Sequence, residues 1–220
     1  MRPFFITGIG TGVGKTLAAA ILTEALEADY WKPVQAGFEN GTDTSWVSGH
    51  ILNSKTKIHP ESYRLSFPAS PHIAAARENR RIDIKEILDE LSRIRNKNPL
   101  IIEGAGGLMV PLNEQEFVVD LAQQLNARVI IVSRNYLGSI NHSLLTSSLC
   151  RSRGLDVAGW VFNDNYLNYE QEIQFWSGYP SLISIPFMES VSRENVHQQA
   201  LKFRQVLREK LLGNSGHDGE

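Results

Sequence analysis

The sequence is poor in cysteine, in net charge and in long apolar runs, and each shortage excludes a class of protein. Its single cysteine, Cys150, cannot build a disulfide framework or a cysteine-rich metal cluster, which fits a reducing compartment. The 22 lysines and arginines nearly balance the 24 aspartates and glutamates, so a net charge of −2 gives no long-range attraction to nucleic acid or membranes. No stretch approaches the roughly 18 apolar residues of a membrane span. We therefore expect a cytoplasmic protein with a small-molecule partner and neither a nucleic-acid nor a membrane partner.

The chain of 220 residues is long enough to bury one core without disulfide or metal support. We assign residues 1–212 to a single domain. Residues 213–220, GNSGHDGE, are polar and glycine-rich, which predicts a flexible C-terminal tail. Cys150 lies in an apolar helical pattern, and we interpret it as an unreactive core residue.

Short apolar runs alternate with helical patterns along the whole chain. Most runs are almost continuously apolar, as are strands that are covered on both faces, so the alternation predicts an α/β fold with a doubly wound, mostly parallel sheet. The predicted strands lie at 4–7, 30–34, 99–103, 127–133, 156–162 and 181–186. The predicted helices lie at 15–27, 83–95, 117–126, 139–153, 167–176 and 193–212.

A polar cluster follows each of the first five predicted strands. Ligands of doubly wound folds bind outside the carboxyl ends of the strands, so we expect these clusters to face one crevice. The clusters are Gly8–Thr16, Lys32–Gly37, Glu103–Gly107, Leu137–His142 and Asn163.

The first cluster, GIGTGVGKT, has the composition of a phosphate-binding loop. Its glycines let backbone N–H groups face phosphate oxygens, Lys15 reaches the outer phosphates, and the Thr16 hydroxyl can ligate Mg²⁺. The strict template has a glycine where Ile9 stands, and the alternative is a glycine-rich surface turn. The strand before the loop and the helix after it favour a phosphate loop, and with it a single-domain fold of the P-loop NTPase type.

Two acidic residues are candidate Mg²⁺ ligands together with Thr16. Mg²⁺ in phosphate sites takes one or two carboxylates beside phosphate oxygens and water. Glu103 ends an apolar strand, in the place of a Walker-B acid. Asp43 follows the second strand, and its position fits either a metal ligand or the N-cap of a helix that begins there.

Seven sequence blocks, taken together and in this order, resemble the dethiobiotin synthetase family. The phosphate loop alone is shared by many unrelated proteins, whereas the KPV, EGAGG and LGxINH blocks at these separations are specific. The blocks are TGIGTGVGKT at 7–16, KPVQAG at 32–37, SPH at 70–72, EGAGGLMVPL at 103–112, LGSINH at 137–142, AGWVFND at 158–164 and IP at 185–186.

The resemblance implies an ATP- and Mg²⁺-dependent ligase that inserts CO₂ between the two amines of 7,8-diaminopelargonic acid. It implies a carbamate on one amine, its phosphorylation by ATP to a carbamic–phosphoric anhydride, and ring closure by the second amine. Dethiobiotin, ADP and phosphate are then the products.

The resemblance also implies roles for individual residues. Lys15, Lys32 and Thr11 are the implied catalytic residues, and Lys32 would contact the carbamate and the transferring phosphate rather than stand as a solvated lysine. The implied ATP contacts are Gly12, Val13, Gly14, Lys15, Thr16, Leu17, Asn163, Ile185 and Pro186. The implied substrate contacts are Lys32, Gly104, Ala105, Gly106, Gly107, Ser139, Ile140 and Asn141, although glycines also suit a plain tight turn.

The helix predicted at 139–153 begins with free backbone N–H groups at Ser139, Ile140 and Asn141, which form an anion site. The resemblance implies that this site receives the substrate carboxylate across the interface of a homodimer with shared active sites. We interpret His142 as a packing residue, and Ser70 as the N-cap of a helix with Pro71 at its first position.

Three positions depart from the family pattern, and other classes of protein remain as alternatives. Ile183 stands where the family often has a glycine, in the segment expected to close over the base. Ala36 stands in place of a frequent hydroxyl residue, and Gly12 in place of a glutamate found in some members; these two departures predict altered nucleotide preference or weaker substrate binding. The main alternative is a P-loop switch ATPase of the partition or septum-positioning type, whose signature lysine is Gly10 here. ATP-dependent amidases or ligases of corrinoid synthesis are longer and carry a further, glutamine-hydrolysing domain.

Overall fold

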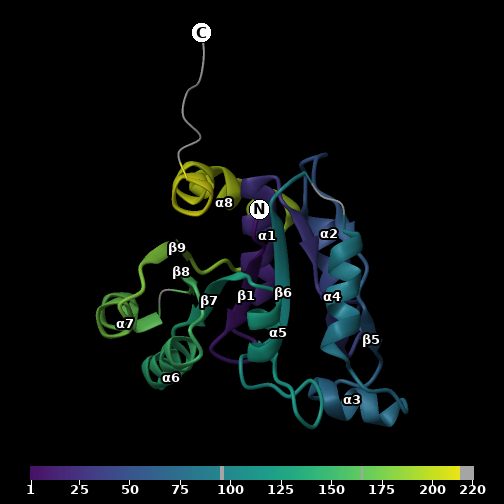
Figure 1. The fold of residues 1–220 in the computed structure, drawn as a ribbon. Coiled ribbons are helices and arrows are strands. Elements are labelled where there is room, and N and C mark those ends of the chain that lie inside the picture. The colour runs from purple at the N-terminus through teal and green to yellow at the C-terminus, as the bar shows by residue number, and fades with distance from the viewer. Residues whose placement is uncertain (95–96, 165, 214–220) are drawn as a thin grey trace.

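Seven parallel strands form the central sheet of the protein (Figure 1). The computed structural model describes residues 1–94, 97–164 and 166–213. Within these ranges the strand order is β4-β2-β6-β1-β7-β8-β9, and all neighbouring strands pair in parallel. The strands are β1 (Phe4–Gly8), β2 (Asp29–Trp31), β4 (Ile58–His59), β6 (Leu100–Gly107), β7 (Arg128–Arg134), β8 (Val157–Asn163) and β9 (Ser181–Ile185).

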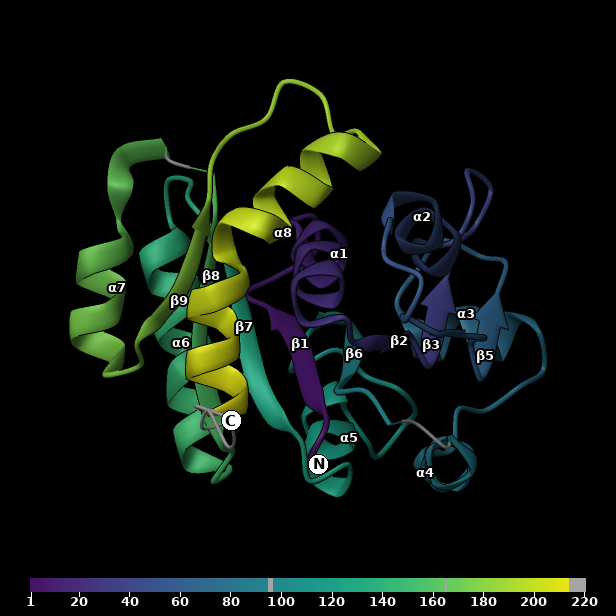
Figure 2. The same ribbon diagram turned by 90° about the horizontal axis from the view of Figure 1, so that it is seen from above.

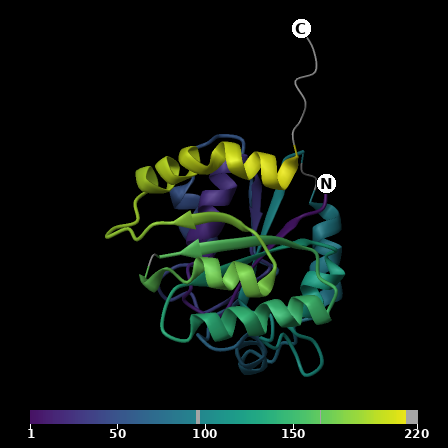
Figure 3. The ribbon, with the colours of Figure 1, turned by 90° about the vertical axis from the view of Figure 1, so that its left-hand side faces the viewer.

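Helices cover both faces of this sheet, which confirms the predicted doubly wound α/β fold. Figure 3 shows α8 on one side of β8 and β9, with α6 and α7 on the other. One face packs against α1 (Lys15–Leu26), α2 (Asp43–His50) and α8 (Arg193–Leu207), which continues as the π-helical turn η2 (Arg208–Leu212). The other packs against α3 (Pro71–Arg77), α4 (Ile84–Arg93), α5 (Val118–Gln124), α6 (Ser139–Ser152) and α7 (Glu170–Ser177), which follows the 3₁₀ turn η1 (Tyr166–Asn168).

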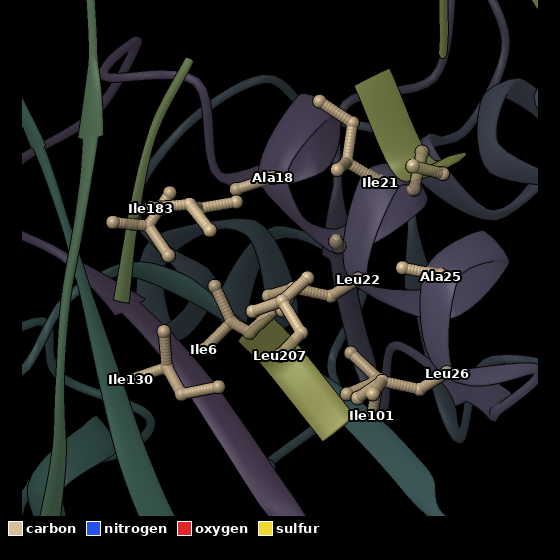
Figure 4. Packing of buried hydrophobic residues seen from close by; sticks show 14 of the residues in the cluster. Ile6, Ala18, Ile21, Leu22, Ala25, Leu26, Ile101, Ile130, Ile183 and Leu207 are labelled. Carbon is tan, nitrogen blue, oxygen red and sulfur yellow. The ribbon is translucent and has the colours of Figure 1, made fainter. Parts of the chain in front are cut away.

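The core lies in two layers, one on each face of the sheet. Along β1, Phe4 and Ile6 face α1 and α8, whereas Phe5 faces the opposite helices. In Figure 4, Ile6 packs with Leu22 of α1 and Leu207 of α8. Because both faces are buried, nearly all successive strand residues are apolar, which explains the almost continuous apolar runs in the sequence.

The strand predicted at 30–34 is two strands in different sheets. β2 ends at Trp31, and β3 (Val34–Ala36) pairs with β5 (Tyr63–Leu65) in a separate two-stranded parallel sheet (Figure 2). Pro33 lies at the break, since proline has no N–H to donate to a central ladder. Lys32 is therefore released from the sheet at the carboxyl end of β2.

Several other elements differ from the sequence-based prediction. The strand predicted to end at Glu103 continues as β6 through Gly107. The sequence analysis predicted neither β4 nor β5. For α2 and α3 it expected only a helix start, near Asp43 as one alternative and at Pro71. The predicted end of the helix at 83–95 and the tail at 214–220 fall on residues outside the described ranges. No helix in the described ranges is long and apolar enough to cross a membrane.

Cys150 is fully buried on α6, as its pattern predicted. Burial raises the pKa of the Cys150 thiol to about 12, so the reactive thiolate is scarce near neutral pH.

Candidate active site

The phosphate loop joins β1 to α1 at the carboxyl edge of the central sheet. Gly12 and Gly14 have φ values of 72° and 93°, in the left-handed region that favours glycine. A Cβ at Gly14 would also lie 2.2 Å from Nδ2 of Asn163, whereas a Cβ at Gly10 would meet no described atom within 4 Å. Gly14 is the N-cap of α1, so the free N–H groups of the first turn point out of the helix at the end of the loop.

A cavity of about 760 Å³ lies beside this loop and brings together half of the predicted site residues. Ala36 also lines it, so this departure from the family pattern lies within the site. Pro68, Ala69, Ser70 and Pro71 form part of its wall. The predicted site residues that line it are Thr11, Gly12, Gly14, Lys15, Thr16, Lys32, Asp43, Glu103, Ala105 and Gly106.

Lys15 lies over the phosphate loop, where its Nζ donates to the carbonyl oxygen of Gly10 at 2.9 Å. Burial lowers the pKa of Lys15 to about 8; the Glu103 carboxylate opposes this shift and the Lys32 ammonium adds to it. An anionic phosphate next to this amine would favour its charged form.

Lys32 joins the two predicted metal ligands. Its Nζ donates to Oε1 of Glu103 at 2.9 Å and to Oδ2 of Asp43. The Lys32 and Glu103 residues are 5% and 1% exposed, so their charges offset each other in a site with little water. Burial alone would lower the pKa of Lys32, but the Glu103 and Asp43 carboxylates outweigh it and raise the pKa, so Lys32 is a cation at neutral pH.

Glu103 has hydrogen bonds on both of its carboxylate oxygens. Thr16 donates from Oγ1 to Oε1 at 2.9 Å, and Tyr30 donates from its hydroxyl to Oε2 at 2.8 Å. Burial, and then the Glu103 charge, raise the pKa of Tyr30 well above its ordinary value, so it stays a donor. The sequence analysis missed Tyr30, because its contact with Glu103 depends on how β2 lies beside β6.

Asp43 is not the N-cap of α2, so that alternative is wrong. Thr42 is the N-cap, and it forms a capping box with Ser45. Asp43 is the first helical residue, and its backbone N–H donates to Oε1 of Gln35 at 3.2 Å while its carboxylate meets Lys32. Gln35, which the sequence analysis also missed, thus ties the start of α2 to β3.

The oxygen atoms of Thr16, Asp43 and Glu103 fit a Mg²⁺ site that is completed by phosphate oxygens and water. All three side chains line the same cavity. Lys32 contacts both carboxylates, and Thr16 also contacts that of Glu103. Within the described part of the chain, no cluster of three or more His, Cys, Asp or Glu residues forms a site that could hold a metal without such a ligand.

A second cavity, of about 720 Å³, lies on the other side of the phosphate loop. Thr11 and Gly12 line both cavities, and Val13 lines this one. The sequence analysis missed the rest of its wall, which consists of Arg134, Asn135, Tyr136, Asp164 and Phe187.

Among the residues predicted to contact the nucleotide base, Asn163 contacts the loop directly, but Asn163, Ile185 and Pro186 line neither of the two cavities beside the loop. Asn163 ends β8 and donates from Nδ2 to the carbonyl oxygen of Val13 at 3.0 Å. Ile185 is paired with Asn163 in the sheet, and Pro186 follows it. Leu17, one turn into α1, packs against the core.

The glycines after Glu103 have packing reasons of their own. A Cβ at Gly104 would lie 2.7 Å from the Phe5 ring, and one at Gly107 would lie 3.2 Å from the Gly8 carbonyl oxygen. Gly106 has a φ of 64° and lines the first cavity. Of the four predicted substrate contacts in this segment, only Ala105 and Gly106 border the cavity.

The predicted carboxylate site at the start of α6 does not join the first cavity within one chain. Ile140 and Asn141 line a third cavity, of about 750 Å³, and Ser139 is fully buried at the first position of the helix. Four of the five predicted polar clusters therefore contain residues that line or contact the loop region, and the fifth lies apart in the single chain.

Fold and site together define an α/β nucleotide-binding domain of the P-loop NTPase class. Solved structures with this fold include a ParA family ATPase from Chlorobium tepidum, at a TM-score of 0.57 and 17% identity over 96% of this chain and 98% of that one. They also include a chain of the Aquifex aeolicus MinC:MinD cell division protein complex, at a TM-score of 0.60 and 16% identity over 100% of this chain and 99% of that one. At these identities the likeness establishes the fold alone.

Sequence comparison places the chain in a particular family. A family described as an AAA domain matches residues 2–195. The ATP-dependent dethiobiotin synthetase of Cytophaga hutchinsonii is 47% identical over 204 residues, which cover 92% of this chain and 97% of that protein. The ATP-dependent dethiobiotin synthetase of Agrobacterium fabrum is 41% identical over 196 residues, which cover 89% of this chain and 91% of that protein. The chain therefore belongs to the ATP-dependent dethiobiotin synthetase family.

Proposed function

We propose that this protein is a dethiobiotin synthetase, which converts 7,8-diaminopelargonic acid, CO₂ and ATP into dethiobiotin, ADP and phosphate. The observation that carries the proposal is the single cavity in which Lys15, Lys32, Thr16 and Glu103 surround the end of the phosphate loop. The identity of 41–47% to proteins that bear this name gives the substrate class.

The proposed reaction has three steps. One amine nitrogen bonds to the carbon of CO₂ and loses a proton, which gives a carbamate. A carbamate oxygen then attacks the γ-phosphorus of ATP, and the bond from that phosphorus to ADP breaks. Finally the second amine attacks the carbonyl carbon and loses a proton, the C–O bond to phosphate breaks, and the cyclic urea is complete.

The residues suit this chemistry because phosphoryl transfer depends on positioning and on charge stabilisation rather than on a covalent enzyme intermediate. Lys15 would bind the outer phosphates, and Lys32, held by two carboxylates, would orient the carbamate toward them. Mg²⁺, held by Thr16, Asp43 and Glu103, would supply further neutralisation of phosphate charge. Thr11 borders both cavities and would contact the reacting phosphate from the loop side.

Two copies of the chain would complete the site. The start of α6 offers backbone N–H groups to a carboxylate, yet it lies apart from the first cavity of its own chain. A homodimer that places this helix start over the partner's cavity would bind the remote end of the diamine.

Product analysis tests the proposed function. Purified protein is incubated with ATP, Mg²⁺, labelled bicarbonate and the diamine, and the acid-stable label is counted. We expect label in a urea, which survives acid, whereas a free carbamate does not. ATP hydrolysis without fixed label would contradict the proposal and favour a switch ATPase, whose hydrolysis responds to a protein or DNA partner.

A further inference from the structure

Tyr30 is a buried residue that touches the site only through Glu103. It lies in the middle of β2 and is 0% exposed. Its ring packs in the core layer between the sheet and α1, and its hydroxyl donates to Oε2 of Glu103 at 2.8 Å. Among the described residues, those that line the first cavity do not include Tyr30.

The register of the sheet explains how Tyr30 reaches the carboxylate. Tyr30 is the partner of Ile101 on β6, and Glu103 lies two residues further along the same face. Such diagonal neighbours are within reach of an aromatic side chain. Because the ring is held by the core, its hydroxyl is a fixed point rather than a mobile one.

This fixed point matters because the last torsion of a glutamate side chain is soft and roughly two-fold. Thr16 and Lys32 both donate to Oε1, which faces the cavity, and Tyr30 takes the opposite oxygen. Because the Tyr30 hydroxyl holds Oε2 in the core, the orientation of the Glu103 carboxylate plane is fixed. Oε1 then points toward the cavity, where the nucleotide phosphates would bind.

We propose that Tyr30 is a positioning residue, whose hydroxyl orients Glu103 for the divalent cation that accompanies the nucleotide phosphates. The inference rests on the proposed function, because that function gives Glu103 its metal. Partners that orient metal ligands typically change metal affinity by 10–100-fold when they are removed.

The test measures Mn²⁺ binding in the presence of ADP, from the electron paramagnetic resonance signal of free Mn²⁺, and subtracts the Mn²⁺ that the same concentration of ADP binds without protein. Tyr30→Phe keeps the ring and removes only the hydroxyl, so we expect its Kd for Mn²⁺ to rise about tenfold. Tyr30→Met also lacks the hydroxyl and fills the core with a flexible side chain, so it provides a second variant with the same expected loss.

Tyr63→Phe is the matched control. Tyr63 is 2% exposed and its hydroxyl also bonds a carboxylate, that of Glu86, but on β5 and α4. Its hydroxyl also accepts from the backbone N–H of Asp83 at 3.0 Å, so Tyr63→Phe loses two hydrogen bonds in the other core layer. We therefore expect thermal stability to fall at least as far as in Tyr30→Phe, while Mn²⁺ affinity stays within about twofold of wild type. If the Tyr30 hydroxyl only stabilised the fold, Tyr30→Phe and Tyr63→Phe would bind Mn²⁺ with the same affinity.

A second measurement repeats Tyr30→Phe in a Glu103→Gln background. If the hydroxyl acts through Glu103, the two substitutions are not additive, and the second change adds little to the Mn²⁺ Kd. Wild-type affinity in folded Tyr30→Phe, an equal loss in Tyr63→Phe, or no Mn²⁺ binding by the wild type with ADP would each overturn the inference. None of these assays uses the diamine or bicarbonate, so a failure of the proposed carboxylation is seen separately in the product analysis.

Discussion

At the scale of single residues, the site is organised around one buried carboxylate. Glu103 accepts from Thr16, Lys32 and Tyr30, which come from α1, the end of β2 and the middle of β2. Leaving a buried charge without such partners costs several kcal/mol, so each donor both stabilises the fold and shapes the site.

Lys32 offers the most direct test at this scale. If its ammonium stabilises the charge on the transferring phosphate, Lys32→Ala removes on the order of 3 kcal/mol of transition-state stabilisation, or roughly a hundredfold in turnover. The KM for the diamine should change far less. Steady-state kinetics on protein whose folding has been checked by thermal unfolding measures both quantities.

Lys55→Ala is the control for Lys32→Ala. Lys55 also pairs with a carboxylate, that of Glu27, but its side chain is 65% exposed. Surface pairs of this kind contribute about 0–1 kcal/mol, so turnover should not change. Unchanged turnover in Lys32→Ala would remove Lys32 from the reacting groups.

The sequence predicted those residues whose role follows from local spacing. Lys15 and Thr16 follow from the loop motif, and Glu103 from its place after an apolar strand. Tyr30 and Gln35 could not be found in this way, because their contacts depend on how β2 lies against β6 and how α2 returns to β3. Such contacts between distant segments have no local sequence pattern.

At the scale of elements, proline and glycine decide where the chain turns. The run YWKPV at 30–34 was predicted as one strand, and the missing N–H of Pro33 divides it between two sheets. β3, β4 and β5 have two or three residues each, too few for an alternating pattern to be recognised. Three of the longer elements, α1, α6 and β7, were predicted to within one residue at each end, whereas the end of the longest strand, β6, was missed by four residues.

The phosphate loop gives a prediction at this scale through two of its glycines. Gly14→Ala forces a side chain into a backbone with φ of 93° and into Asn163, at a cost of roughly 1–2 kcal/mol from the backbone alone. The loop must shift to relieve this strain, so its N–H groups lose alignment and ATP affinity should fall about tenfold. Calorimetric titration with a non-hydrolysable ATP analogue measures this loss.

Gly10→Ala in the same loop is the comparison. Its Cβ would meet no described atom within 4 Å, so ATP affinity should stay within about twofold of wild type. If both variants lost ATP affinity equally, the loss in Gly14→Ala would have a cause other than the backbone conformation and the contact with Asn163 at that position.

At the scale of the whole molecule, a second buried carboxylate joins three distant segments. Glu24 of α1 is 0% exposed and accepts from the backbone N–H groups of Leu52 and Asn53 at 2.9 and 3.1 Å. It also accepts from Nδ2 of Asn53 and meets Nδ1 of His197 on α8 at 2.8 Å. Helices α1 and α8, two of the three that cover one face of the sheet, are therefore fixed to the loop after α2.

This network predicts a pH-dependent contribution to stability. Burial would raise the pKa of Glu24, but the hydrogen bonds from Asn53, His197 and Leu52 outweigh it and lower the pKa below 4.5. A carboxylate with a lowered pKa stabilises the fold above its unfolded value, and this contribution disappears as pH falls through the folded value. Glu24→Gln should therefore cost about 1–3 kcal/mol at pH 7 and progressively less below pH 4.5.

Urea unfolding of wild type and Glu24→Gln across this pH range measures the difference. Glu39→Gln, at an exposed position, serves as the control, and its stability should match wild type within about 0.5 kcal/mol throughout. A loss in Glu24→Gln that is the same at pH 7 and in acid would contradict the assigned role of the charge.

The largest gap between sequence and single-chain structure is the start of α6, which lies outside the first cavity although the LGSINH block was expected to bind substrate. A local pattern can identify an anion site at a helix start, but not which chain supplies the rest of the pocket. The proposed homodimer resolves this if each site combines the cavity of one chain with the α6 start of the other.

Mixing two inactive variants tests this arrangement. Lys32→Ala damages the cavity, and Asn141→Glu places a negative charge at the exposed start of α6, where it should repel the substrate carboxylate and raise the diamine KM. In a mixed dimer with shared sites, one site carries both changes and the other carries neither. Equimolar variants that are unfolded and refolded together should therefore recover about a quarter of wild-type activity, since half of the dimers are mixed. If each site lies within one chain, the mixture will show only the summed residual activities of the two variants, because no combination of them then contains an intact site.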